Sequence, residues 1–530
     1  MKKRTLVGLF GLFTAVNSVA ESKTLVYCSE AAPTTFSPTL AMDNATMDAT
    51  AETMFDRLLS FKAGTTELMP SLAESWTISP DGKSYTFKLR QNVKFHSNQQ
   101  FKPSRNFNAD DVLFTFNRQW DKQNPYYKLA NYEMFNAMGM ADLIKSVEKI
   151  DDYTVRISLN QPSAPFLANL ATSFMSVQSA EYADQLVRQN RLQDLERQPI
   201  GTGPFQFYGY QPNAEIRYIA FQQYWQGRAK LDRLVFSITP DASVRLARLK
   251  NGECDVMPYP NPTDIDDIKQ DKALQLLAKP AMNVGYIALN MAKAPFDNVK
   301  VRQALNYAVN KKAIIDSVYQ GLASQAKSPL PPVVWGYNEK LQDYEFNPEK
   351  AKALLKEVGL ENGFETEIWA MPVSRAYNPN ARRMAEMVQQ DWAKIGVKAK
   401  IVSFEWGEYL NRMSKGEHFA GMAGWNGDNG DPDNFLAPAL TCDTIASGEN
   451  YAHFCNAEYD KLINQAAQEF DQTKRAALYK QAQQIFVEQA PWITIANSIS
   501  YIPLSKKVSG YVPSAVGLHN FYSTDIQTDK

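Results

Sequence analysis

Two charged residues in the second half of this 530-residue chain follow strand-like segments. Asp428 comes after Gly421–Trp425, a run of small and apolar residues, and Arg375 comes after the apolar run Ile368–Val373. Ligands of α/β proteins collect at strand ends, so this pair could clamp a charged ligand. The same pair also suits an ordinary salt bridge, and the sequence pattern alone favours that second interpretation.

Motifs of catalysis and metal binding are missing from the sequence. The four histidines are scattered, with no His-Glu-x-x-His pair, and there is no Gly-x-Ser-x-Gly elbow or Gly-x-x-x-x-Gly-Lys phosphate loop. Gly201-Thr202-Gly203 begins like a dinucleotide fingerprint, but the third glycine is absent, so we interpret it as a tight turn. We therefore expect neither an enzyme nor a bound cofactor or metal.

The acid-rich segment 428–434 does not have the spacing of a calcium loop. An EF-hand needs an acid or amide at its third position, where Gly430 stands here. For Asp431 and Asp433 we expect a polar surface turn, because Asp, Asn, Gly and Pro are the residues that turns prefer.

The first twenty residues have the pattern of a secretory signal peptide. Lys2, Lys3 and Arg4 precede the apolar run Leu6–Val16, and small residues at Ser18 and Ala20 fit cleavage after Ala20. No cysteine stands at that position to carry a lipid, and no later segment has eighteen uninterrupted apolar residues. We expect an exported protein that is soluble after cleavage.

Composition predicts two or three domains and argues against nucleic acid as a partner. The remaining chain exceeds what one core usually supports, and 56 basic residues balance 57 acidic ones. The four cysteines, an even number in an exported chain, favour disulfides, with three pairings open. Cys442 and Cys455 flank the Gly448–Asn450 turn and could close a hairpin-like loop, which would leave Cys28 and Cys254; four free thiols are the alternative.

The elements expected to position these residues change character along the chain. Ser79-Pro80-Asp81-Gly82 between two alternating runs predicts a β-hairpin, and Asn108 predicts the start of a helix. From about residue 280, strands alternate with helices, which predicts an α/β fold. Expected there are a strand at 283–290, helices at 299–309 and 379–395, a helix capped by Asn347-Pro348 and stopped by Gly359, and a strand at 398–403.

Strand-like sequence returns at 492–496 and 500–504. If this segment crosses back into the first lobe, two extended connections, near 280–290 and 492–502, would form a hinge. In the helix at 379–395, we expect Met384, Met387, Val388, Trp392 and Ile395 to form one core-facing stripe.

Several phrases, in order along the mature chain, resemble the peptide-binding proteins of bacterial ABC importers, the oligopeptide, dipeptide and nickel solute-binding family (family 5). They are Leu72–Trp76, Tyr85–Arg90, Phe107–Val112, Gly201–Phe205 and Val301–Leu305. Within the family, the dipeptide-binding branch is most similar, through Thr24–Cys28, Thr239–Arg245, Asn378–Met384 and Gly427–Asn434.

The resemblance implies a two-lobed periplasmic binding protein fold of the three-segment type, with two interlobe crossover strands. We expect lobe I at 21–280 with a subdomain inserted at about 54–200, lobe II at 281–498, and a return to lobe I at 499–530. It also supports Cys28–Cys254 and Cys442–Cys455 as the disulfides.

The resemblance further implies that Asp428 takes the ammonium of a dipeptide and Arg375 its carboxylate. Arg offers a planar fork to a carboxylate, and Asp accepts hydrogen bonds from an ammonium. Tyr377, Gly424 and Trp425 adjoin these two residues and are expected at the ligand. The resemblance therefore favours a ligand clamp over a salt bridge between Asp428 and Arg375.

The segment 41–46, with Met42 and Thr46, corresponds to a ligand-proximal loop and has fewer hydroxyl groups than the resemblance leads one to expect. This departure leaves open a ligand preference different from that of the dipeptide-binding branch, because the resemblance extends to relatives described as haem or glutathione binders. A dipeptide for an inner-membrane ABC permease is the first hypothesis, glutathione or haem the second and a periplasmic peptidase the third. We expect a monomer.

Overall fold

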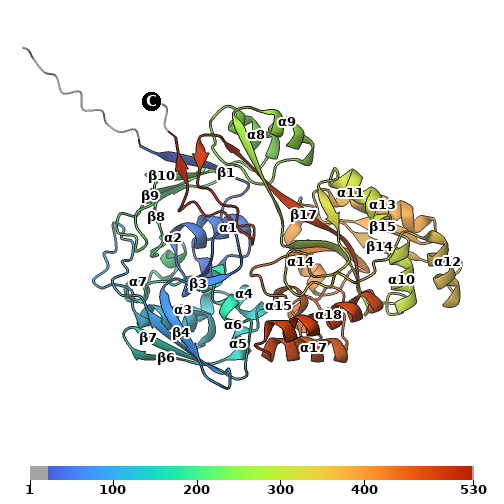
Figure 1. The fold of residues 1–530 in the computed structure, drawn as a ribbon, viewed down its shortest axis with the longest axis horizontal. Helices are drawn as coiled ribbons and strands as arrows, with labels where there is room; N and C mark the ends of the chain where they lie inside the picture. Colours follow the sequence, from blue (N-terminus) through green and yellow to red (C-terminus); the bar gives the residue numbers. More distant parts are fainter. Residues whose placement is uncertain (1–21, 528–530) are drawn as a thin grey trace, which may run out of the picture.

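The computed structural model describes residues 22–527, which form two lobes joined by extended strands. Figure 1 shows the lobes side by side, with β17 in red running from one to the other. We call lobe I the part built on the sheet β1-β10-β9-β8 and the sheet β4-β5-β7-β6. Lobe II is the part around the seven-stranded sheet. The two-lobed α/β fold expected from the sequence is confirmed.

Lobe I contains a four-stranded sheet in which β1 is parallel to β10 and the other pairs are antiparallel. A second, fully antiparallel sheet has its own core. The strands of lobe I are β1 (Thr24–Ser29), β2 (Leu59–Phe61), β3 (Leu68–Pro70), β4 (Ala73–Ile78), β5 (Ser84–Leu89), β6 (Ile144–Asp151), β7 (Thr154–Leu159), β8 (Phe205–Gln211), β9 (Glu215–Ala220), β10 (Arg233–Ile238), β18 (Val508–Ser509) and β19 (Asp525–Ile526).

Its helices are mostly short, and α3 begins as the sequence predicts. They are α1 (Asn44–Ala49), α2 (Ala51–Met54), α3 (Ala109–Trp120), α4 (Glu133–Ala137), α5 (Met140–Leu143), α6 (Phe166–Asn169), α7 (Ala180–Arg188), α8 (Ala242–Lys250) and α9 (Ile265–Gln270). Asn108 caps α3 in a reciprocal arrangement with Asp111, and Asp43 caps α1. The predicted hairpin is also confirmed: β4 and β5 pair across the turn at Gly82, whose φ is 68°.

Lobe II is a sheet in the order β11-β17-β12-β16-β14-β15, with β13 added to β17. The strands are β11 (Leu274–Pro280), β12 (Asn283–Leu289), β13 (Ala323–Gln325), β14 (Glu365–Trp369), β15 (Lys398–Val402), β16 (Ala420–Asn426) and β17 (Trp492–Ser505). The helices are α10 (Val299–Tyr307), α11 (Lys311–Val318), α12 (Pro348–Glu357), α13 (Ala381–Ala393), α14 (Trp406–Ser414), α15 (Asp433–Leu436), α16 (Thr444–Ser447), α17 (Ala457–Gln468) and α18 (Gln472–Gln489).

The core-facing stripe predicted for 379–395 lies on α13. Met384, Val388, Trp392 and Ile395 are in the largest core, and Met387 packs against it. The helix starts at Ala381 rather than Pro379, because the Asn380 side chain caps it by accepting from the Arg383 N–H.

Two strands at 492–496 and 500–504 were expected, but β17 is one continuous strand of 14 residues. Its first half pairs with β12 and its second half with β11. At the changeover, the Asn283 Oδ1 accepts from the Ser498 N–H at 3.0 Å, and Asn497 Nδ2 donates to the Asn283 carbonyl at 2.7 Å. These bonds keep the polar centre of β17 extended, so the two connections between the lobes lie side by side.

The C-terminal segment packs into lobe I, where Ile502 and Phe521 share a core with Leu25 and Phe236. The residue boundaries expected for the lobes stay a prediction. Among the described helices, none has the length and apolar character needed to cross a membrane. The expected signal peptide, residues 1–20, lies outside the described residues.

Candidate functional site

Asp428 and Arg375 lie on loops that leave the same edge of the lobe II sheet. β14 and β16 are parallel neighbours, so their carboxyl ends share an edge. Asp428 lies two residues beyond the end of β16, and Arg375 lies six residues beyond the end of β14, in a tight turn where it pairs with Asn378. Strand β14 is shorter than the apolar run 368–373, so Arg375 lies in a loop and not at the strand end.

The Asp428 carboxylate is largely buried and is held by one amide. Asn434 Nδ2 donates to its Oδ2 at 3.2 Å, and Asn434 Oδ1 accepts from the Asp428 N–H at 2.9 Å. Burial raises the pKa of Asp428 to about 6, and the hydrogen bond from Asn434 acts in the opposite direction. Among residues 22–527, neither Asp428 nor Arg375 forms a salt bridge, so the direct pair that the sequence pattern favoured does not exist in this structure.

A small cavity beside Asp428 is lined by both lobes. Its volume is about 20 Å³, which is room for one or two water molecules. Lobe II contributes Asn426, Gly427 and Asp428; the remaining lining residues are Asn44, Met47, Met134, Thr172, Ser173, Phe174, Val516 and Leu518. The carboxylate therefore faces the boundary between the lobes.

Arg375 also faces lobe I. Its guanidinium is exposed and lies 5.1 Å from the ring centre of Trp406. Burial raises the pKa of the Tyr259 hydroxyl, and Arg375 acts against that rise. Tyr259 accepts a hydrogen bond from Asn44 Nδ2 at 3.0 Å, and Asn44 also lines the cavity beside Asp428, so the first turn of α1 connects the surroundings of the two charged residues.

Glu30, at the end of β1, is a residue of this region that sequence reasoning missed. Burial raises the pKa of its carboxyl group, and Arg245 and Arg375 act against that rise. Its buried Oε2 has no hydrogen-bond partner among the described residues. The residue stands next to the Thr24–Cys28 phrase, but nothing in the sequence near it indicates the electrostatic influence of Arg375, 345 positions away.

Tyr377 is fixed beneath the Arg375 turn by two glycines. Gly285 on β12 and Gly424 on β16 are register partners. A Cβ on Gly285 would lie 2.2 Å from the Tyr377 carbonyl oxygen, and one on Gly424 would lie 2.2 Å from its ring. Tyr319 donates to the same carbonyl at 2.6 Å. The structure therefore places Gly424 against Tyr377, where it helps to position Arg375.

The other expected site residues, Trp425, Thr46 and Met42, do not line the cavity beside Asp428. Trp425 is partly buried and donates from Nε1 to Asn434 Oδ1 at 3.4 Å. Thr46 is fully buried. Its hydroxyl donates to Asp43 Oδ2 at 2.7 Å and accepts from the Thr34 N–H at 2.9 Å. Met42 is 50% exposed. Of the loop at 41–46, the structure thus brings Asn44 to the cavity, while the Thr46 hydroxyl stabilises the start of α1.

The surface turn expected at Asp431 and Asp433 is wrong. Asp431 is 7% exposed, and both of its oxygens accept from the Arg475 guanidinium at 2.8 Å. Arg475 lies on α18, 44 positions later, so the pairing of these charges depends on the tertiary fold. The ion pair fixes the Asp428 loop to α18.

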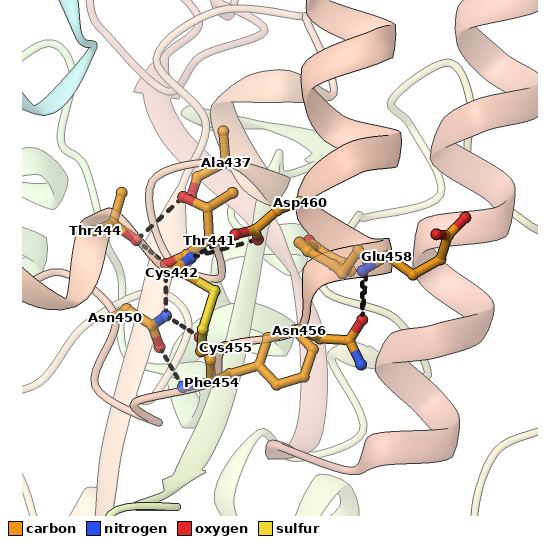
Figure 2. Close-up of a disulfide and its surroundings, with 11 residues drawn as sticks. Ala437, Thr441, Cys442, Thr444, Asn450, Phe454, Cys455, Asn456, Glu458 and Asp460 are labelled. Carbon is orange, nitrogen blue, oxygen red and sulfur yellow. Dashed lines mark hydrogen bonds between the residues drawn. A yellow bond between two sulfur atoms is a disulfide. The ribbon is translucent and has the colours of Figure 1, made fainter.

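The structure contains the disulfides Cys28–Cys254 and Cys442–Cys455, with Cα separations of 5.8 and 4.5 Å. The loop closed by the second pair contains helix α16 and is not a hairpin. Figure 2 shows how Asn450 supports it: the side chain donates to the carbonyls of Thr441 and Phe454 and accepts from the Phe454 N–H.

Comparison with known proteins places this architecture in a family. Residues 67–447 match the bacterial extracellular solute-binding proteins, family 5 (middle region). The chain belongs to this family. It is 53% identical to the dipeptide-binding protein of Escherichia coli K12 over 98% of both chains. It is 51% identical to heme-binding protein A of Haemophilus influenzae, over 96% of this chain and 93% of that one.

A solved structure of the family has the same fold. The dipeptide-binding protein of Pseudoalteromonas sp. SM9913, crystallised with Met-Leu, is 40% identical and superposes with a TM-score of 0.88. The alignment covers 95% of this chain and all of that one. This family 5 chain therefore has the same overall fold as that dipeptide-binding protein.

Proposed function

We propose that this family 5 protein captures dipeptides in the periplasm and delivers them to an ABC permease of the inner membrane. Asp428 takes the ligand's ammonium, and Arg375 takes its carboxylate. The observation that carries the proposal is that these opposite charges follow the parallel neighbours β14 and β16 at one edge of the lobe II sheet, and that neither forms a salt bridge among the described residues.

Electrostatics supports a cationic partner for Asp428. A buried carboxylate without a counter-charge is costly, and here its pKa rises to about 6. An ammonium placed beside it would restore the missing counter-charge. Each charged hydrogen bond that forms would contribute about 1.5–3 kcal/mol.

Two fixed charges also select ligand length. Each residue adds about 3.3–3.6 Å to an extended peptide, so a ligand one residue longer cannot keep both termini on Asp428 and Arg375. The two charges do not constrain the side chains of the bound peptide. We therefore propose selectivity for dipeptides with broad tolerance of their side chains.

Closure of the lobes completes the site. The cavity of about 20 Å³ is too small to admit a peptide, so the ligand enters only when the lobes move apart. The paired connections β11–β12 and β17 are suited to act as the hinge. Binding is then the closing of lobe I over a ligand held on lobe II.

A second candidate is glutathione or haem binding. The 51% identity to a protein named heme-binding protein A favours testing haem, and glutathione carries an ammonium and carboxylates like a dipeptide. Met47 and Met134 line the cavity and offer thioether sulfurs, whereas none of the four histidines lines it. The charged pair fits a peptide better than a porphyrin.

Export and the absence of catalysis belong to the same proposal. We propose cleavage after Ala20, a monomer in the periplasm, and no peptidase activity. Incubating peptides with the pure protein tests the last point, since any catalytic cleavage would contradict it.

The experiment that tests the function is identification of the ligand. Native mass spectrometry of protein purified without denaturation should show bound dipeptide masses. Calorimetry of ligand-free protein should then give heat with Ala-Ala, and glutathione and haemin titrations separate the second candidate. Binding of haemin or glutathione without any dipeptide would contradict the proposal.

A further inference from the structure

The side chain of Asn434 uses all of its hydrogen-bonding capacity at the Asp428 site. It is 3% exposed, at the start of α15. Its Oδ1 accepts from the Asp428 N–H at 2.9 Å and from Trp425 Nε1 at 3.4 Å. Its Nδ2 donates to Asp428 Oδ2 at 3.2 Å and to the Met138 sulfur at 3.3 Å. An amide has two donors and two acceptor positions, so none is left unused.

These partners also fix the orientation of the amide. A backbone N–H and an indole N–H can only donate, so the atom that faces them must be the oxygen. The NH₂ group is thereby directed at the Asp428 carboxylate and at Met138.

Met138 belongs to lobe I, immediately after α4, whereas Asn434 and Asp428 belong to lobe II. One side chain thus joins the Asp428 carboxylate to the opposite lobe. The same loop makes two further contacts with lobe I. Asn429 Nδ2 donates to Asn169 Oδ1 at 2.9 Å, and a Cβ on Gly430 would lie 2.0 Å from Thr66 Oγ1.

The back of the loop is anchored to lobe II by the buried Asp431–Arg475 ion pair. The loop is therefore fixed on one side by α18 and contacts lobe I on the other. Lobe opening must break the contacts of Asn434 with Met138 and of Asn429 with Asn169, while the ion pair stays within lobe II.

We propose that Asn434 is a positioning residue that couples capture of the ligand's ammonium by Asp428 to closure of the lobes. This inference rests on the proposed function. When the lobes close, Met138 receives one N–H of the amide, which holds the other N–H on Asp428 Oδ2. The carboxylate is then directed at the ammonium only in the closed form, so a ligand without an ammonium gains less from closure.

The test compares two ligands that differ only in the ammonium. Ala-Ala carries it, and propanoyl-alanine is the same molecule with hydrogen in place of the amino group. The ratio of their dissociation constants measures how well Asp428 recognises the ammonium. For Asn434→Ala we expect this ratio to fall at least tenfold relative to the unaltered protein.

Asn169→Ala is the matched control, because it removes the other interlobe hydrogen bond of the loop without touching Asp428. It should weaken both ligands by a similar factor and leave the ratio unchanged. Equal weakening of both ligands by Asn434→Ala, or a ratio that falls as much in Asn169→Ala, would overturn the proposal.

Met138→Leu keeps the volume of the side chain and removes the sulfur acceptor, so it covers the case in which Asn434→Ala does not fold. We expect the ratio to fall two- to fivefold, with the melting temperature of the ligand-free protein within a few degrees of the unaltered value. An unchanged ratio would show that the contact between Asn434 and Met138 does not affect how Asp428 recognises the ammonium. Failure of the unaltered protein to bind Ala-Ala would overturn the proposed function as well, whereas normal binding with an unchanged ratio overturns only this inference.

Discussion

The Asp428 carboxyl group titrates in an unusual range because it is buried without a cation. Its pKa is about 6, above the ordinary value of 3.8. An ammonium is attracted only to the ionised form, so protonation competes with the ligand below pH 6. We expect the affinity for Ala-Ala to reach its plateau about one unit above that pH and to fall by up to about tenfold per pH unit below it.

Calorimetry from pH 4.5 to 7.5 checks this dependence. Asp428→Asn cannot titrate and serves as the control, with weak binding at every pH. A profile that is flat for the unaltered protein down to pH 4.5 would contradict the assigned role.

The same burial predicts an effect on stability. The folded pKa lies above the ordinary value, so the ionised carboxylate disfavours folding at pH 7.5, and the penalty lessens as the pH falls through 6. Asp428→Asn should therefore stabilise the ligand-free protein at pH 7.5, by at most about 3 kcal/mol. Urea unfolding of ligand-free protein measures this change. Destabilisation by several kcal/mol would instead indicate an ion pair at Asp428.

Arg375 is predicted to act on the other terminus. Its side chain is exposed, so Arg375→Ala should leave the melting temperature of the ligand-free protein nearly unchanged. Loss of its charged hydrogen bonds should weaken Ala-Ala binding roughly 10- to 150-fold. Arg375→Lys keeps the charge without the planar fork and should bind with intermediate affinity.

An amidated peptide, Ala-alaninamide, lacks the carboxylate and provides the comparison by calorimetry. Its weak binding should hardly change in Arg375→Ala. Equal losses for both peptides would show that Arg375 does not bind the ligand carboxylate.

At the scale of elements, the paired glycines of β12 and β16 determine where the Arg375 turn lies. Gly285→Ala would place a Cβ 2.2 Å from the Tyr377 carbonyl oxygen, a clash that no side-chain rotation relieves. We expect weaker Ala-Ala binding together with a loss of stability of about 1–3 kcal/mol from overpacking. Gly209→Ala in β8 is the control, since the nearest atom there is an Arg217 side-chain nitrogen at 3.6 Å. A Gly285→Ala protein that binds Ala-Ala as tightly as the Gly209→Ala control would contradict this role.

The disulfides stabilise two separate elements. In the loop-closure picture, removing a bridge over 13 positions costs about 3 kcal/mol and one over 226 positions about 5 kcal/mol. Cys442→Ser with Cys455→Ser should therefore lower the melting temperature less than Cys28→Ser with Cys254→Ser. Calorimetric unfolding of the two double variants checks the order, and the reverse order would contradict it.

At the scale of the whole molecule, local signals predicted the elements well. The caps at Asn108 and Asn347, the Gly82 turn and the α13 stripe depend on neighbours in sequence, and the structure confirms them. The two crossover strands were implied by the family resemblance, and the strand-like runs near 280–290 and 492–502 were compatible with them.

Contacts across long sequence separations could not be predicted from the sequence. The surface turn at Asp431 failed because its partner Arg475 lies on α18, and the part played by Gly285 depends on its register with Gly424. The connection from Asn434 to Met138 spans 296 positions and both lobes. Sequence thus indicated Asp428 and Arg375 as candidates for ligand binding but missed Glu30, and the fold supplied the groups that surround them.

The central claim is that one cleft holds both termini of a dipeptide, and calorimetry of the ligand-free protein tests it most directly. Four ligands suffice: Ala-Ala, propanoyl-alanine, Ala-alaninamide and Ala-Ala-Ala. We predict tight binding of Ala-Ala and much weaker binding of the three others, since each lacks one terminal charge or exceeds the length. Equal affinity for all four, or no heat with Ala-Ala, would contradict it.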